Sequence, residues 1–252
     1  MERAVKSLRT CLPPCGREVL RELGEVVNYR CEATSVAGFV QQLACCYVRH
    51  GYHHYVVGEI PARKDPRAVD ERIIERYGIE LSKFARARRK RSGLANVQYI
   101  RFRSFFVLCA TGPRGEHRFF DEHGSGQIRN IREQPIGFAG YSIGWHRGVD
   151  RRWHVSVRIH PERYRSIKAY LLDLARRRSV EQLAGEFAGL RFEPYAPVRR
   201  QLLSLLKAVN GERKVAGLTP VPVELLRLRR HVVRPFEERA GLGSAPTVRR
   251  LE

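Results

Sequence analysis

Acidic residues are scarce in this chain relative to basic ones. Its 252 residues include 26 Asp and Glu against 47 Lys and Arg, so the formal net charge is +21. Lysine is scarce as well: seven of the basic residues are Lys, and 47 − 7 = 40 are Arg. Arginine binds phosphate and guanine through paired hydrogen bonds and stacks on bases. The charge balance therefore favours a nucleic-acid partner over any other role for this charge.

Long apolar runs are absent too. None approaches the about 20 residues that span a bilayer. No long amphipathic helix with a bulky apolar face is evident to bind a membrane surface, so no membrane partner is expected. Nothing resembles a secretory signal, and the adjacent Cys45-Cys46 pair is a poor disulfide framework. These features predict free thiols and a cytoplasmic location.

The chain also lacks complete phosphate-binding and zinc motifs. Gly124-Ser125-Gly126 has neither a third glycine at the dinucleotide-binding offset nor a following Gly-Lys-Ser/Thr. Cys11 and Cys15 have the spacing of half a zinc site, but no second pair stands at a convincing distance.

Hydrophobic periodicity predicts an α+β fold. Residues 36–178 read as helix, strand, two helices, four strands and a helix. This order predicts an antiparallel sheet with packed helices, ferredoxin-like or related, followed by a helical C-terminal region. The predicted division is an N-terminal arm (1–35), a nucleic-acid-binding core (36–178), a helical region (179–235) and a flexible tail (236–252).

One predicted helix is strongly basic. Residues 83–91 contain six cations and no carboxylate, whereas the preceding helix, which begins at Asp65-Pro66, alternates acids with arginines. Unpaired like charges repel unless a polyanion screens them. We therefore expect this helix to make the main phosphate contacts. Its cations are Lys83, Arg86, Arg88, Arg89, Lys90 and Arg91.

The predicted strand at 97–110 interleaves aromatic and basic residues. Alternation places Tyr99, Arg101 and Arg103 on one face. If that face is open, the arginines follow a phosphate backbone while Tyr99 stacks on a base. The alternative is a face covered by a helix, with the arginines paired at its edge. Further phosphate contacts are expected from Arg151 and Arg152 in a hairpin, and from Arg176, Arg177 and Arg178 at a helix end.

The C-terminal pattern SVEQLAGEF…APVRRQLLSLL is similar to a helix-turn-helix. In that motif the start of the second helix reads base edges, which would give Arg199 and Arg200 a role in specificity. The connection is longer than the usual turn, and a plain helical pair covering the sheet is the alternative.

A histidine-bearing strand near Gly115–Phe120 and a later helix with Tyr164 suggest an enzymatic alternative. With the small sheet and the basic helix, residues 52–178 resemble the HUH endonucleases, which are rolling-circle replication initiators and relaxases. The resemblance implies a metal-dependent single-strand nickase or strand transferase of a replication system or mobile element. Tyr164 would be its nucleophile and His117 a ligand of Mg or Mn. The family pairs two histidines, and this strand has one.

Two other roles stay open. Asp121, Glu122 and His123, with Glu116 and His117, form a polar cluster that could hold a metal as a nuclease does. Alternatively, the chain is a ribonucleoprotein subunit with protein partners. Phosphate contacts look alike in DNA and RNA, so both are candidate ligands.

Overall fold

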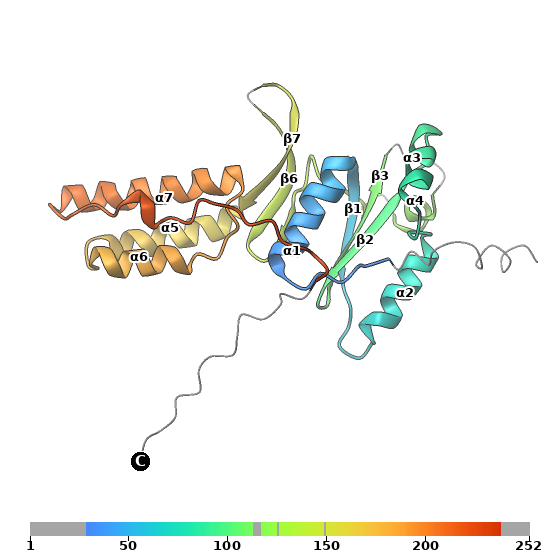
Figure 1. Cartoon of the computed structure of the whole chain (residues 1–252), viewed down its shortest axis with the longest axis horizontal. Coiled ribbons are helices and arrows are strands. Elements are labelled where there is room, and N and C mark those ends of the chain that lie inside the picture. Colours follow the sequence, from blue (N-terminus) through green and yellow to red (C-terminus); the bar gives the residue numbers. More distant parts are fainter. Residues whose placement is uncertain (1–28, 113–116, 125, 149, 238–252) are drawn as a thin grey trace, which may run out of the picture.

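Two antiparallel sheets and the helices that cover them make up the structure, a computed structural model that describes residues 29–112, 117–124, 126–148 and 150–237 (Figure 1). The α+β class and the helical C-terminal region are as predicted. Cys11 and Cys15 lie outside the described residues. Within them, no helix is both long and apolar enough to cross a bilayer.

The first sheet has the ferredoxin-like arrangement. Its strands are ordered β2-β3-β1-β4, and each neighbouring pair is antiparallel. Since β3 separates β1 from β2, the connection from β1 to β2 is a split β-α-β unit. The strands are β1 (Tyr52–Glu59), β2 (Val97–Phe102), β3 (Phe105–Thr111) and β4 (Arg129–Asn130), and the connecting helices are α2 (Pro66–Arg76), α3 (Lys83–Arg91) and α4 (Arg118–Glu122).

Two sequence predictions in this sheet are wrong. The single strand predicted at 97–110 is a hairpin, because the chain turns at Arg103-Ser104 and Arg103 adopts a left-handed φ of 56°. The strand predicted after residue 115 is the short helix α4. His117 is the N-cap of α4, and its Nδ1 accepts a hydrogen bond from the Phe119 amide at 3.1 Å.

A long helical segment lies between the two sheets (Figure 1). It begins as α1 (Val36–Gln41), continues as a π-helical turn (η1, Gln42–Tyr47) and a 3₁₀ turn (η2, Val48–His50), and ends at Gly51, whose φ is +96°. Phe39 is fully buried and joins the two sheets. Its ring lies 5.9 Å from Phe105 of the first sheet and 4.2 Å from Phe138 of the second.

The second sheet leads into the C-terminal helices. It is ordered β5-β6-β7, and Gln201 bonds both the amide and the carbonyl of Ile159 on the edge strand, at 2.8 and 3.1 Å. This contact satisfies backbone groups that an edge strand would otherwise expose. The elements are β5 (Ile136–Phe138), β6 (Tyr141–Arg147), β7 (Trp153–Ile159), α5 (Pro161–Ala175), α6 (Val180–Gly189) and α7 (Ala196–Val215).

The last described segment returns to α1. The helical region was predicted to extend to residue 235, but among the described residues after α7 only the 3₁₀ turn η3 (Val223–Leu225) forms. The chain then runs extended, and the Pro235 carbonyl accepts from the Thr34 amide at 2.9 Å. Gly38 permits this approach, since a Cβ there would meet Pro235 Cα at 2.9 Å. Of the predicted tail, residues 238–252 lie outside the described part.

Candidate nucleic-acid interface

Helix α3 forms as its sequence predicts. The Ser82 side chain caps it by accepting from the Ala85 amide at 3.2 Å, and Gly93, with a φ of +72°, ends it. Four cations occupy the last turn, where positive charge complements the helix dipole. No residue of α3 is buried, and the Phe84 ring is 85% exposed among these cations. The helix therefore presents a basic face with one aromatic ring on it.

None of the α3 cations forms an ion pair with a carboxylate in the described residues. Arg86 and Arg89 instead donate to the backbone carbonyls of Leu81 and Ala95. Lys83, Arg88 and Arg91 are exposed. Their positive charge is therefore available to an external anion.

The basic surface extends from α3 onto the end of the helical segment that precedes β1. Lys90 Nζ lies 3.4 Å from the carbonyl oxygen of His50. Lys83, Arg86 and Lys90 line a cavity of about 360 Å³ there, together with His50. On the other side of this helix end, Arg49 lines a second cavity with residues of the β6–β7 hairpin. Arg49 therefore lies between the cavity beside α3 and the cavity beside the hairpin, and it carries the positive charge of this surface toward the hairpin.

The hairpin supplies the next cations. Arg151 and Arg152 are exposed at its tip, as the sequence predicts, and Arg151 adopts a left-handed φ of 58°. Arg147 Nε donates to the Arg151 carbonyl at 2.9 Å, which holds the turn together. Asp150 accepts from the Arg152 amide at 3.1 Å and contacts His154 at 2.8 Å.

The structure corrects the prediction for Tyr99 and Arg101. Both are buried, at 0% and 2% exposure, because α2 covers the face of the sheet on which they lie. Tyr99 donates to Asp70 of α2 at 2.7 Å, and Arg101 forms an ion pair with the same carboxylate at 2.8 Å. Burial lowers the pKa of Arg101, but hydrogen bonds to Asp70 and Glu32 raise it above the ordinary value. Neither side chain is available to stack on a base or bind a phosphate.

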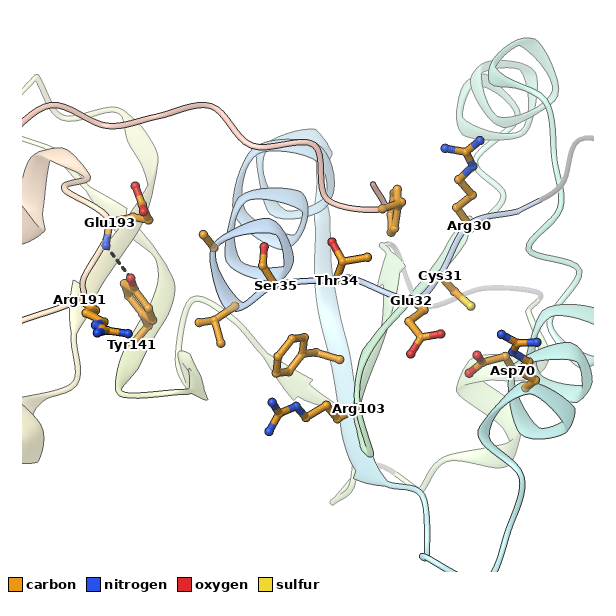
Figure 2. Close-up of a pocket in the computed structure, with 16 residues that line it drawn as sticks. Arg30, Cys31, Glu32, Thr34, Ser35, Asp70, Arg103, Tyr141, Arg191 and Glu193 are labelled. Atoms are coloured by element: carbon orange, nitrogen blue, oxygen red, sulfur yellow. Dashed lines mark hydrogen bonds between the residues drawn. The ribbon is translucent and has the colours of Figure 1, made fainter. Parts of the chain in front are cut away.

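Arg103 lies on a groove of about 1120 Å³ between α1, the first sheet and the chain around Tyr141 (Figure 2). Arg30, Arg67 and Arg191 also line it. The groove carboxylates have partners elsewhere: Arg101 binds Glu32 and Asp70, and Arg227 lies 3.1 Å from Glu193. The four groove arginines form no ion pair with described residues, so the groove is a second basic region.

The C-terminal arginines divide into two groups. Arg199 and Arg200 are exposed near the start of α7, close to the residues of α7 that line the hairpin cavity. The predicted sites Arg176, Arg177 and Arg178 lie at the far end of α5, away from α3 (Figure 1). Arg176 and Arg177 pair with Glu212 at 2.7 Å and Asp173 at 3.3 Å.

The two residues of the nickase hypothesis are not brought together. Tyr164 on α5 packs against the core formed with α1 and the second sheet. His117 caps α4 beside Tyr77, on the opposite side of the first sheet, and Figure 1 shows α4 and α5 at opposite ends of the molecule. Burial and the Arg89 cation lower the pKa of His117.

In the polar cluster after β3, Glu122 is bound by two residues at the end of α2. Tyr77 donates to Glu122 at 2.9 Å, and Arg76 donates to the same carboxylate at 2.7 Å. Burial, together with the bond to Glu122, raises the pKa of Tyr77 to about 12. Among the described residues, no three His, Cys, Asp or Glu side chains converge as a metal site would require. Glu116 lies outside them.

Sequence reasoning missed the aromatic residues of this surface. Phe84 is an apolar residue within a run of cations, which is a readable signal for a stacking side chain. Trp145 and Trp153 are the chain's two tryptophans, and both line the hairpin cavity. They lie on the paired strands β6 and β7, where the register places Trp145 opposite Val155 and Trp153 opposite Arg147.

A comparison with models of known protein families finds no match to this chain, and no curated protein matches it.

Proposed function

We propose that this protein binds nucleic acid, mainly through contacts with the phosphate backbone. The observation that carries the proposal is the basic face of α3, where none of six cations has a carboxylate partner among the described residues. Exposed cations of this kind displace counterions from a nucleic acid, which is favourable at moderate salt. The surface around residues 49 and 50 and the hairpin tip extends it.

This surface supports binding that tolerates many sequences. Its cations are long, exposed side chains suited to phosphates, which carry no sequence information. The exposed Phe84 ring adds a platform on which any base can stack. Arg199 and Arg200 are the remaining candidates for base contacts. The four described cysteines form no disulfide with one another, which supports action in a reducing compartment such as the cytoplasm.

We favour binding over the nickase alternative. A tyrosine nucleophile must reach the same phosphate that the metal polarises. Tyr164 and His117 lie on opposite sides of the first sheet, and His117 caps helix α4 instead of lying on a strand.

The test is a titration of labelled single-stranded and duplex DNA and RNA with the full chain at several salt concentrations. The proposal requires binding whose affinity falls linearly on a logarithmic salt scale. The variant Lys83→Gln/Arg88→Gln/Arg91→Gln should bind more weakly and with a shallower slope. Equal affinity of the variant and the original protein would show that α3 is not the contact surface.

A further inference from the structure

The β6–β7 hairpin, the end of the helical segment before β1 and the start of α7 enclose a cavity of about 510 Å³. Trp145, Trp153 and Tyr195 line it, and the chain contains no other tryptophan. A volume of this size falls within the range of small-molecule sites. We propose that this cavity binds an unstacked base of a single-stranded nucleic acid. The inference rests on the proposed function and names the form of nucleic acid that is bound.

The hairpin carries its apolar face from the core out to the surface. Val157, paired with Ile143, is 2% exposed and lies in the core. The next pair outward on that face is Trp145 with Val155, both half-buried, and the pair after it brings Trp153 opposite Arg147. Trp153 is 44% exposed. The aromatic surface is therefore continuous with the core yet open to a ligand.

Two of the aromatic rings have cation–π contacts with arginines. The guanidinium carbon of Arg132 lies 5.1 Å from the Trp153 ring centroid, and that of Arg230 lies 4.7 Å from the Tyr195 centroid. Arg49 lines the cavity as well. Asp150, the carboxylate on this hairpin, is bound to His154. A base in the cavity would therefore have cations near the phosphates on either side of it.

The chemistry of the lining favours a base over an apolar peptide side chain. Trp145, Trp153 and Tyr195 supply aromatic rings on which a base can stack. An apolar peptide side chain would leave the surrounding cations without counter-charges, whereas a base brings its phosphates with it, so a base is the better match.

Tryptophan fluorescence tests this directly, because both tryptophans line the cavity. Binding to unlabelled single-stranded DNA should quench the emission as the base stacks on the rings. An abasic oligonucleotide of the same length retains the phosphates, so it should bind with little quenching. A blunt duplex should behave like the abasic strand. Binding of all three ligands is followed independently by competition against a labelled strand.

Substitution of Trp153 provides a second readout. Trp153→Ala should weaken single-strand binding by about tenfold, within the range for loss of one stacked base, and leave duplex affinity unchanged. Trp153→Phe keeps an aromatic ring and should retain most of the affinity. Circular dichroism verifies the fold of both variants. If Trp153→Ala fails to fold, the quenching comparison on the unaltered protein still decides.

The outcomes separate the two proposals. Salt-sensitive binding without quenching by any strand, and with Trp153→Ala unchanged, would overturn the base-binding cavity and leave the proposed function intact. Such a result would assign the aromatic surface to a protein partner instead. Absence of binding to any nucleic acid would overturn both.

Discussion

Replacing Lys83, Arg88 and Arg91 by glutamine is expected to reduce both the affinity for nucleic acid and its dependence on salt. All three side chains are exposed, none pairs with a described carboxylate, and none holds a backbone carbonyl. The substitutions therefore remove charge from α3 without removing the contacts that attach the helix to the sheet. Arg86 and Arg89, which bond Leu81 and Ala95, are left in place.

The magnitude follows from counterion release. Each phosphate neutralised on duplex DNA contributes about 0.9 to the slope of log affinity against log salt, and about 0.7 on single strands. Three lost contacts would reduce the slope by up to about 2.7 on duplex DNA, and partial contacts would reduce it by about 1. Fluorescence anisotropy with a labelled oligonucleotide, repeated across salt concentrations, measures both the slope and the affinity.

A matched variant controls for net charge. Arg176→Gln/Arg177→Gln/Arg178→Gln also removes three positive charges, but from the far end of α5. There, Arg176 and Arg177 already pair with Glu212 and Asp173. It should leave the slope nearly unchanged. If both triple variants lose slope equally, net charge rather than the α3 surface determines binding, and the placement of the phosphate contacts on α3 is refuted.

Three further predictions concern the buried contacts and stability. Asp70→Ala should lower the free energy of unfolding by about 3 kcal/mol, because the Arg101 charge stays buried without its main partner. Denaturant unfolding measures this change. Salt-dependent binding should persist at temperatures where the variant is folded. Gly38→Ala should cost about 1–3 kcal/mol, because its Cβ would meet Pro235 at 2.9 Å, and thermal melts compare the variant with the original chain. Burial and Arg132 lower the pKa of His53 in the folded protein. As the pH falls below about 6.5, His53 is therefore protonated in the unfolded chain before it is protonated in the folded protein, and this favours unfolding. The melting temperature should therefore decrease as the pH is lowered from about 7.5 to about 5.5, and it should decrease less for His53→Gln. An equal decrease in both proteins would argue against a half-buried, neutral His53.

Local signals predicted the helices that frame the basic surface. Asp65-Pro66 marks the start of α2 in the sequence, because the capping effect of these residues depends on nearby backbone amides alone. The run of cations in residues 83–91 likewise marked α3, which the structure shows to be capped by Ser82. The α+β class with a helical C-terminal region followed from the order of helices and strands. Such features depend on short stretches of chain, so the sequence alone was sufficient to find them.

Long-range pairing explains what sequence reasoning missed. Arg103-Ser104 forms the β2–β3 turn with no glycine, asparagine or proline to mark it, so the strand was predicted to continue. Asp70 pairs with Arg101 across 31 residues, and no local pattern shows that α2 covers this face. The charged strand face was therefore predicted as a possible binding surface, whereas the fold uses it to attach α2.

The most direct test of the central claim is the salt dependence of nucleic-acid binding by the unaltered full chain. Labelled single-stranded and duplex oligonucleotides are titrated with protein between about 50 mM and about 200 mM salt. The basic surface predicts binding to both. The logarithm of the affinity should fall linearly with the logarithm of the salt concentration, with a slope of magnitude of about 2 or more. No binding at the lowest salt, or an affinity that does not change with salt, would contradict it.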